Sequence, residues 1–213
     1  MWGIPALGAA DARIWTFDTL QTILRGPSVA IAAGGWCDSH ATPIVECGTW
    51  HWHLFSGGGL KMHSSLTIAN RFLDLANEEG DTLTPMQLLK LVYIAHGWML
   101  GLYGVPLIND EVQAWKYGPV IPKLYHSISQ FRSDPVRGPL RAHDPDPLVS
   151  VENALIQQVY EIYGNMTGIE LSRLTHQPGS PWAQTYQDGV SNIVISNDLI
   201  EDHYRTLASG AEA

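Results

Sequence analysis

The chain has 213 residues, 45% of them hydrophobic, which is enough for one domain with its own core. Asp and Glu number 21 against 12 Lys and Arg, giving a formal net charge of −9. This balance disfavours direct nucleic-acid binding, because phosphates attract basic surfaces. No segment approaches the roughly 20 apolar residues of a membrane span, and the first residues lack a secretory signal. We therefore expect a cytoplasmic protein that binds no membrane.

The first 61 residues differ in composition from the rest. They contain five of the eight Trp and both Cys, and no apolar period persists in them. Five side chains there resemble a zinc set: Cys37, His40, Cys47, His51 and His53. Zinc sites separate their ligand pairs by a longer loop than the six residues between His40 and Cys47, so the match is imperfect. We predict no metal and no cofactor.

The string GGGLKM, residues 57–62, suggests a translation start inside the sequence. Consecutive glycine codons are rich in purines, as a bacterial ribosome-binding site is, and two further codons give an ordinary gap to a start codon. We expect the biological start at Met62. Residues 1–61 would then be a non-native upstream extension or a disordered leader, residues 62–209 the folded domain, and residues 210–213 a frayed tail.

Two helices are predicted directly after Met62. Ser65 can cap a helix that runs to about Glu79. The string TPMQ at 84–87 provides an N-cap Thr, Pro at the first helical position and Gln three residues on, so it starts a helix that ends at Gly104. Apolar residues surround nearly the whole second helix, which predicts a buried central helix. We expect Lys90 on this helix to be ion-paired or to extend its amine to solvent.

The remaining segments alternate short elements with turns. Residues 111–115 could form a helical turn or a strand, and residues 117–119 (YGP) must be a joint, because the residue before Pro avoids the helical region. Helices are predicted at 122–131, 150–163, from the capping box at 167–170, from 180–181 and at 197–208, with a loop at 133–148 and an extended segment at 190–195. The fold class is mainly α: a compact helical domain around a buried central helix, with one or two short extended segments.

Catalytic motifs are absent from the sequence. It has no phosphate loop, no GxGxxG, no HExxH and no GxSxG, and no Cys follows Met62. Ser172 and His176 are four residues apart and could form the pair of a Ser/His-dependent hydrolase. Catalytic serines usually lie on a strained turn beside an oxyanion hole, whereas Ser172 is predicted within a helix. We predict a protein that is not an enzyme and has no catalytic residues, with the hydrolase as the alternative.

Three motifs resemble those of the Panacea domain family. They are K-L-x-Y within LLKLVYIAHGWML, A-W-x-x-G-P-V within QAWKYGPVIPKLYH, and L-S-x-x-T-H followed by P-W within ELSRLTHQPGSPWAQ. The resemblance covers about Leu66 to Leu207, while residues 1–61 match nothing in the family. The residues that form the structural motif are Lys90, Leu91, Tyr93, Trp115, Leu171 and Ser172.

The resemblance implies a binding function, since the family includes the SocA-like antitoxins and the phage-associated GepA proteins. The expected function is that of an antitoxin of a type II toxin-antitoxin system, neutralising a cognate toxin encoded nearby by direct binding. An alternative is a proteolytic adaptor that presents the toxin to a ClpX-type protease of the AAA+ class. A third is a phage-derived protein that modulates the host without a toxin. The acidic chain suits a basic partner, because complementary fields speed association.

Two turns rich in Trp, Pro and Gly are the candidates for the partner-binding surface. The first is the joint at 115–119 and the second runs from Thr175 to Trp182. We expect them to meet against the central helix near Tyr93. Interfaces enrich Trp and Tyr, which bury much area for little lost rotamer freedom. An alternative is that Trp115 and Tyr117 only fill the core. The predicted partner-binding residues are Lys116, Tyr117, Gly118, Pro119, His176 and Trp182.

Overall fold

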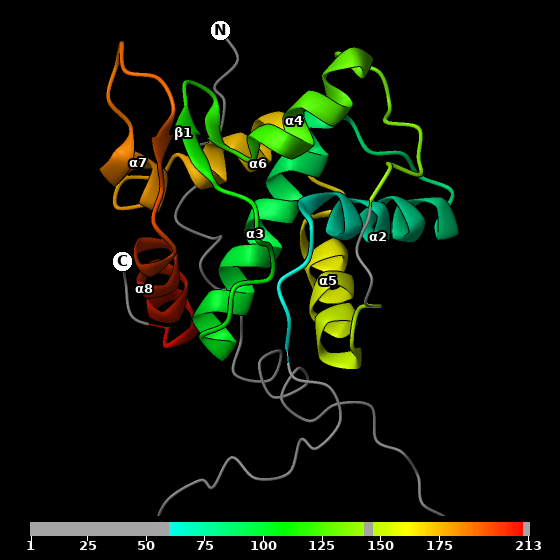
Figure 1. Cartoon of the computed structure of the whole chain (residues 1–213), viewed down its shortest axis with the longest axis horizontal. Coiled ribbons are helices and arrows are strands. Elements are labelled where there is room, and N and C mark those ends of the chain that lie inside the picture. Colours follow the sequence, from blue (N-terminus) through cyan, green and yellow to red (C-terminus); the bar gives the residue numbers. More distant parts are fainter. Residues whose placement is uncertain (1–59, 143–146, 211–213) are drawn as a thin grey trace, which may run out of the picture.

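The computed structural model describes residues 60–142 and 147–210 (Figure 1). Within these ranges the chain forms seven α-helices, one 3-10 turn and three short strands, so the prediction of a mainly α fold is confirmed. The helices are α2 (Ser65–Glu78), α3 (Pro85–Tyr103), α4 (Pro122–Ile128), α5 (Ser150–Tyr163), α6 (Gly168–Thr175), α7 (Pro181–Thr185) and α8 (Asn197–Ala208).

Helix α3 is the buried centre of this arrangement, as predicted. It packs against α2, α5, α6 and α8, and Figure 1 shows it between α8 on one side and α2 and α5 on the other. Its start follows from the capping box: the Thr84 N–H donates to Gln87 Oε1 at 3.0 Å, and the Gln87 N–H donates to Thr84 Oγ1 at 3.5 Å. Its residues from Leu88 to Leu100 are all buried, which accounts for the apolar pattern around the helix.

The contact between α3 and α8 depends on two glycines. A Cβ atom added to Gly97 would lie 2.1 Å from the Tyr204 ring, and one added to Gly101 would lie 2.6 Å from the Cβ of Tyr204. Their absence of side chains lets the Tyr204 ring reach Trp98, with centroids 5.1 Å apart in an edge-to-face arrangement. The glycines therefore set how closely α8 can approach α3.

His96, also on α3, joins α8 to the loop that follows α3. Its Nε2 is 3.1 Å from Oδ1 of Asn197, and its Nδ1 accepts the Ile108 N–H at 3.4 Å. Because an amide oxygen only accepts, the proton of the neutral ring lies on Nε2. Burial lowers the pKa of His96 to about 4, although the Asn197 bond acts in the opposite direction.

A small antiparallel sheet covers one end of α3. Its strands are β1 (Gln113–Trp115), β2 (Gly118–Val120) and β3 (Ile193–Val194), in the order β2-β1-β3. Trp115 pairs with Gly118, so β1 and β2 form a hairpin whose loop is Lys116–Tyr117. The sequence allowed either a helical turn or a strand at 111–115, and the structure has a strand at 113–115. In Figure 1 the hairpin, α6 and α7 lie at the same end of the molecule.

Some predicted boundaries are wrong by one or a few residues. The first helix is capped by Ser64, not Ser65. The fourth helix has its predicted bounds, Ser150–Tyr163, and the Val149 N–H before it donates to Glu152 at 2.9 Å. The helix predicted at 122–131 ends as an α-helix at Ile128 and continues as a 3-10 turn (Ser129–Phe131). The extended segment at 190–195 is a strand only at 193–194, because the preceding Asn192 has a φ of 62° and leaves the strand conformation.

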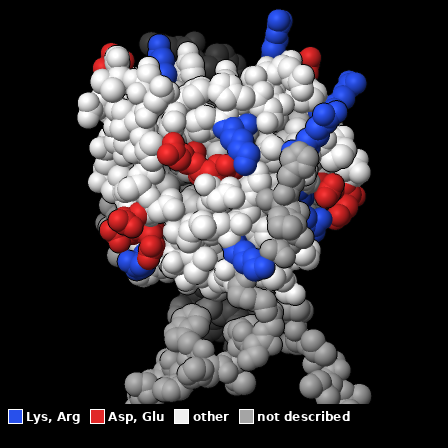
Figure 2. Space-filling view, viewed as in Figure 1, with Lys and Arg blue, Asp and Glu red and all other residues white. Residues whose placement is uncertain are grey.

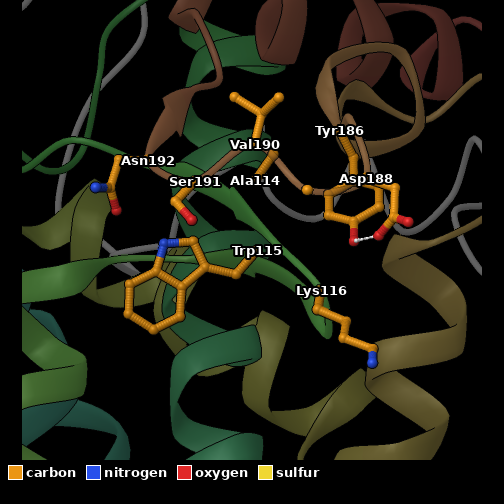
Figure 3. Close-up of a pocket in the computed structure, with 9 residues that line it drawn as sticks. Ala114, Trp115, Lys116, Tyr186, Asp188, Val190, Ser191 and Asn192 are labelled. Carbon is orange, nitrogen blue, oxygen red and sulfur yellow. Dashed lines mark hydrogen bonds between the residues drawn. The ribbon is translucent and has the colours of Figure 1, made fainter.

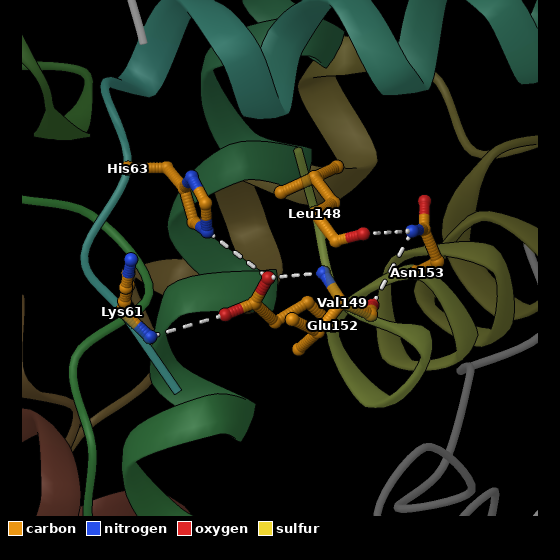
Figure 4. Close-up of polar contacts among 6 residues, drawn as sticks. All are labelled: Lys61, His63, Leu148, Val149, Glu152 and Asn153. Carbon is orange, nitrogen blue, oxygen red and sulfur yellow. Dashed lines mark hydrogen bonds and ion pairs between the residues drawn. The ribbon is translucent and has the colours of Figure 1, made fainter. Parts of the chain in front are cut away.

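A buried polar cluster fixes the segment before α2 (Figure 4). His63 Nε2 lies 3.0 Å from Oε2 of Glu152, and both side chains are almost fully buried. The His63 N–H donates to the Leu107 carbonyl, and its own carbonyl accepts the Asn109 N–H, so the backbone also pairs with the loop after α3. The Lys61 N–H approaches Glu152 Oε1 at 3.4 Å. No motif in the sequence indicates this cluster.

Several predictions fall outside the described residues. These are the suggested zinc set, the extension apart from Leu60 and Lys61, and the last three residues of the tail. Among the described residues, no group of three or more His, Cys, Asp or Glu side chains could hold a metal ion. No helix in the described ranges combines the length and the apolar character needed to cross a membrane.

We propose that the folded unit begins at Met62. Among the described residues, the contacts of His63 join the start of the domain to the loop after α3 and to Glu152, and a chain shortened to begin at Met62 keeps them. Its midpoint of thermal unfolding should lie within about 3 °C of the full chain's, because the contact of the Lys61 N–H with Glu152 Oε1, at 3.4 Å, is weak. Differential scanning calorimetry of both chains tests this, and a drop of more than about 5 °C would assign residues 1–61 a stabilising role.

Candidate functional site

The amine of Lys90 connects the central helix to the hairpin. Nζ donates to the Tyr117 carbonyl at 2.8 Å and to the Pro119 carbonyl at 3.0 Å, and the residue is only 2% exposed. Burial lowers the pKa of Lys90 to about 7. A neutral amine has two N–H donors, which these two carbonyls satisfy. The expectation of an ion-paired or solvent-reaching lysine is wrong: among the described residues no carboxylate lies within ion-pair distance of this amine.

Gly118 is required where the hairpin approaches this amine. Its φ is 103°, and an added Cβ would lie 2.3 Å from Lys90 Nζ and 2.8 Å from Cε1 of His176. Two-residue hairpin loops commonly need positive φ within the loop. Here Lys116 and Tyr117 have ordinary φ values, and Gly118 provides the left-handed residue directly after them.

The second turn meets the first, as predicted, but the meeting point is Lys90. The Trp182 indole N–H donates to the Trp115 carbonyl at 2.7 Å, and Ser172 Oγ donates to the Tyr117 carbonyl at 3.2 Å. Tyr93 lies elsewhere on α3, packed edge-to-face against Tyr204 with centroids 6.3 Å apart. The contact at Lys90 lies about one helical turn before Tyr93, the residue near which the turns were expected to meet.

Three aromatic rings form a row beside the hairpin. The rings of His176 and Trp182 have centroids 3.9 Å apart, and those of Trp182 and Tyr186 stack at 4.7 Å with an interplanar angle of 17°. All three residues are half-buried. The row and the hairpin loop together make one surface, which we call the hairpin face: Lys116, Tyr117, His176, Trp182 and Tyr186.

Ser172 and His176 come together, but not as an activated nucleophile. Ser172 Oγ lies 3.4 Å from His176 Nδ1, and the same Nδ1 makes a very short contact with the Ser172 carbonyl. A carbonyl only accepts, so Nδ1 carries the proton and cannot take one from the hydroxyl. Ser172 Oγ instead donates to Tyr117. This geometry disfavours the Ser/His-dependent hydrolase.

The predicted site residues divide by exposure. Lys116 and Tyr117 are exposed, with 65% of Tyr117 accessible, and His176 and Trp182 are half-buried. Gly118 and Pro119 are buried, so they can shape a binding surface but present little of it. Of the structural motif, Leu91, Tyr93 and Leu171 lie in the core with Lys90, while Trp115 and Ser172 are half-buried.

A hollow of about 440 Å³ beside the hairpin was not predicted (Figure 3). It opens where the β1–β3 ladder ends, and the 186–192 segment forms its second wall. A β-turn shapes this segment: the Val190 N–H donates to the Gln187 carbonyl, and Gly189 has a φ of 78°. The Asp-Gly pair at 188–189 is a turn signal that could have indicated it. We call this cavity the aromatic hollow. It is lined by Ala114, Trp115, Lys116, Tyr186, Asp188, Gly189, Val190, Ser191 and Asn192.

Comparisons with known proteins agree with the resemblance found in the sequence. Residues 88–183 match the model of the family described as antitoxin SocA-like, Panacea domain. Over this range the chain is similar to SocA-like Panacea domains, and the range contains Lys90, the hairpin, α6 and Trp182. The chain is also 28% identical over 152 residues to the antitoxin SocA of Caulobacter vibrioides, covering 65% of this chain and 80% of that protein. No solved structure matches the chain.

We predict that Gly118→Ala destabilises the domain by at least about 2 kcal/mol. The alanine would strain the backbone at a positive φ, and its Cβ would clash with the buried Lys90 amine. Urea unfolding followed by circular dichroism measures the change. Gly179→Ala is the matched control: its φ is 82°, but an added Cβ would meet nothing within 4 Å. Equal losses in the two variants would show that the approach to Lys90 costs nothing beyond the backbone strain.

Lys90 should make stability depend on pH above neutrality. The unfolded chain keeps this proton up to 10.5, whereas the folded chain releases it near its pKa of about 7. The unfolded state therefore binds more protons between these values, so stability rises with pH and is lost as pH falls toward 7. Urea unfolding between about pH 7 and pH 9 should show a slope of up to about 1.4 kcal/mol per pH unit.

Lys90→Met should be less stable throughout, because it leaves two carbonyls without their donor, but it should lack this slope. Lys116→Met, which removes an exposed amine, should keep it. If Lys90→Met retained the full slope, another group would be the source of the pH dependence.

Proposed function

We propose that this protein is an antitoxin of the type II class, which neutralises a protein toxin encoded beside its gene by binding it directly. The observation that carries the proposal is the similarity to the antitoxin SocA, together with a family match that spans the whole of the Lys90–hairpin assembly. The support for neutralisation by direct binding, as opposed to another mode, comes from the hairpin face.

The hairpin face suits protein binding because its backbone is already fixed. Lys90 fixes the hairpin through two hydrogen bonds to its backbone carbonyls. Trp182 fixes strand β1 through a third. Association costs less free energy when the surface is ordered before the partner arrives. Tyr117 then presents a large aromatic side chain, 65% exposed, from a rigid support.

Charge supports a basic partner. The net charge of the chain is −9, and a positively charged toxin would approach it faster than a neutral one. The effect should weaken as salt screens the charges over roughly 10 Å at 0.1 M ionic strength. The proposal therefore includes a rate of association that falls with added salt.

No catalysis is part of this proposal. The Nδ1 of His176 is occupied as a donor, so Ser172 has no base beside it. We infer that both residues position the hairpin, since Ser172 bonds to the Tyr117 carbonyl and His176 packs on Trp182. Ser172→Ala should then reduce the affinity for the toxin or the stability of the fold, and no catalytic reaction should depend on this residue.

Co-expression with the neighbouring small reading frame tests the proposal. Growth should be restored by this protein, and the two proteins should co-purify as a stoichiometric complex. Tyr117→Ala should weaken the complex by about tenfold or more, as truncation of a central aromatic anchor does. Lys116→Glu and Arg137→Glu make the same charge change on the hairpin loop and on a distant exposed loop, so only the first should alter binding.

Three outcomes would contradict parts of the proposal. Full affinity in Tyr117→Ala and Lys116→Glu, with both variants folded, would place the binding surface elsewhere. Loss of the toxin from cells with no stable complex, dependent on a AAA+ protease, would favour the adaptor. A multiple-turnover reaction abolished by Ser172→Ala would favour the hydrolase.

A further inference from the structure

The aromatic hollow has the elements of a receptor for a single side chain. Trp115 from the end of β1 and Tyr186 from the segment after α7 line it, and Asp188 lies beside Tyr186 (Figure 3). The two walls come from parts of the chain about 70 positions apart, brought together by the short β1–β3 ladder.

Both rings are held in place by contacts outside the hollow. Trp115 packs edge-to-face on Tyr125 with centroids 5.0 Å apart, and its indole N–H donates to Gln113 at 3.0 Å. Tyr186 stacks on Trp182. A ligand entering the hollow would therefore meet fixed aromatic surfaces, which attract cations through their negatively polarised faces.

Asp188 adds a carboxylate beside the Tyr186 ring. Its Oδ1 accepts the Tyr186 hydroxyl at 3.2 Å, which directs the group toward the ring, and Oδ2 makes no hydrogen bond or ion pair with any described residue. A carboxylate offers about four acceptor positions, so capacity for a second donor remains. The turn at 187–190 fixes its backbone.

Lys116 is the one cation in the lining. Its Nζ lies 5.9 Å from the centroid of the Tyr117 ring, and Figure 3 shows the amine pointing away from Trp115. The lysine therefore contributes its aliphatic stem to the hollow, while its charge lies toward the hairpin loop.

We propose that the aromatic hollow binds the guanidinium group of an arginine side chain on the protein partner. Arginine combines a planar cation that stacks on aromatic rings with a donor fork that fits a carboxylate. The net charge of −9 favours such a basic partner. Lysine fits less well, because its ammonium neither stacks as a plane nor donates two parallel bonds.

This inference rests on the proposed function for the nature of the partner, but its geometry is independent of it. The Trp115 wall lies within the family match at 88–183, whereas Tyr186 and Asp188 lie beyond it. Part of the binding site for the partner can therefore come from residues outside the range that matches the family.

Small ligands test the hollow without any toxin. The full chain, labelled with ¹⁵N, is titrated with N-acetyl-arginine amide, and the Trp115 indole signal is followed by NMR. N-acetyl-citrulline amide is the matched ligand, equal in shape but uncharged, and N-acetyl-lysine amide has the charge without the plane. The arginine ligand should bind at least about fivefold more tightly than either.

Variants then locate the binding. Asp188→Asn should weaken the arginine ligand by about fivefold or more, and Lys116→Met should strengthen it up to about twofold by removing a like charge. Asp74→Asn, the same change at an exposed position on α2, should have no effect. Equal binding of the citrulline ligand, or an unmoved Trp115 signal, would overturn the inference, as would tighter binding of N-acetyl-glutamate amide.

A double-mutant cycle joins this site to the complex. Each arginine of the toxin is changed to Gln and combined with Asp188→Asn, and one of them should be strongly non-additive. Neutralisation that survives Asp188→Asn, with no arginine ligand bound, would overturn this inference and leave the proposed function standing. Binding of the arginine ligand by a protein that neutralises no neighbouring toxin would do the reverse.

Discussion

The buried amine of Lys90 joins the hydrophobic core to the surface at one point. From α3 it donates to the carbonyls of Tyr117 and Pro119, the residues on either side of Gly118. A carboxylate partner would have fixed one side chain, whereas two carbonyls fix a stretch of backbone. The hairpin, the Ser172 contact to the Tyr117 carbonyl and the Trp182 contact to Trp115 all depend on that backbone being in place. The apolar helix thereby positions a polar surface.

This arrangement separates two kinds of residue within one motif. Gly118 and Pro119 are buried and serve the geometry, while Lys116 and Tyr117 between the strands are exposed and can vary their contacts without loss of core packing. The aromatic row of His176, Trp182 and Tyr186 extends the rigid region sideways toward the hollow. Rigid backbone with exposed side chains is a design that lets one scaffold support different partners.

The sequence predicted what local chemistry controls and missed what depends on distant backbone. The helices capped by Thr84 and Thr167 were identified because each capping box is contained within four residues, and both capping boxes are present. The prediction for Lys90 was wrong because its partners are backbone carbonyls, which the sequence does not reveal. The hollow was missed because Trp115 and Asp188 line it together only where a ladder of two residue pairs joins β1 to β3. The position of the Ser172–His176 pair was anticipated, but its tautomer depends on a carbonyl contact that only the structure provides.

The neutral ring of His96 gives the C-terminal helix a separate response to acid. Its Nδ1 must stay unprotonated to accept the Ile108 N–H, and the folded-state pKa is lowered to about 4 from 6.5. The stabilisation present above 6.5 is therefore lost as the pH falls through about 4. A protonated ring would direct a second N–H at that amide and disturb the joint between the loop and the first residue of α8. In mild acid, amide hydrogens of α8 would then exchange ahead of those of α3, making this helix a cooperative unit that opens before the rest of the domain.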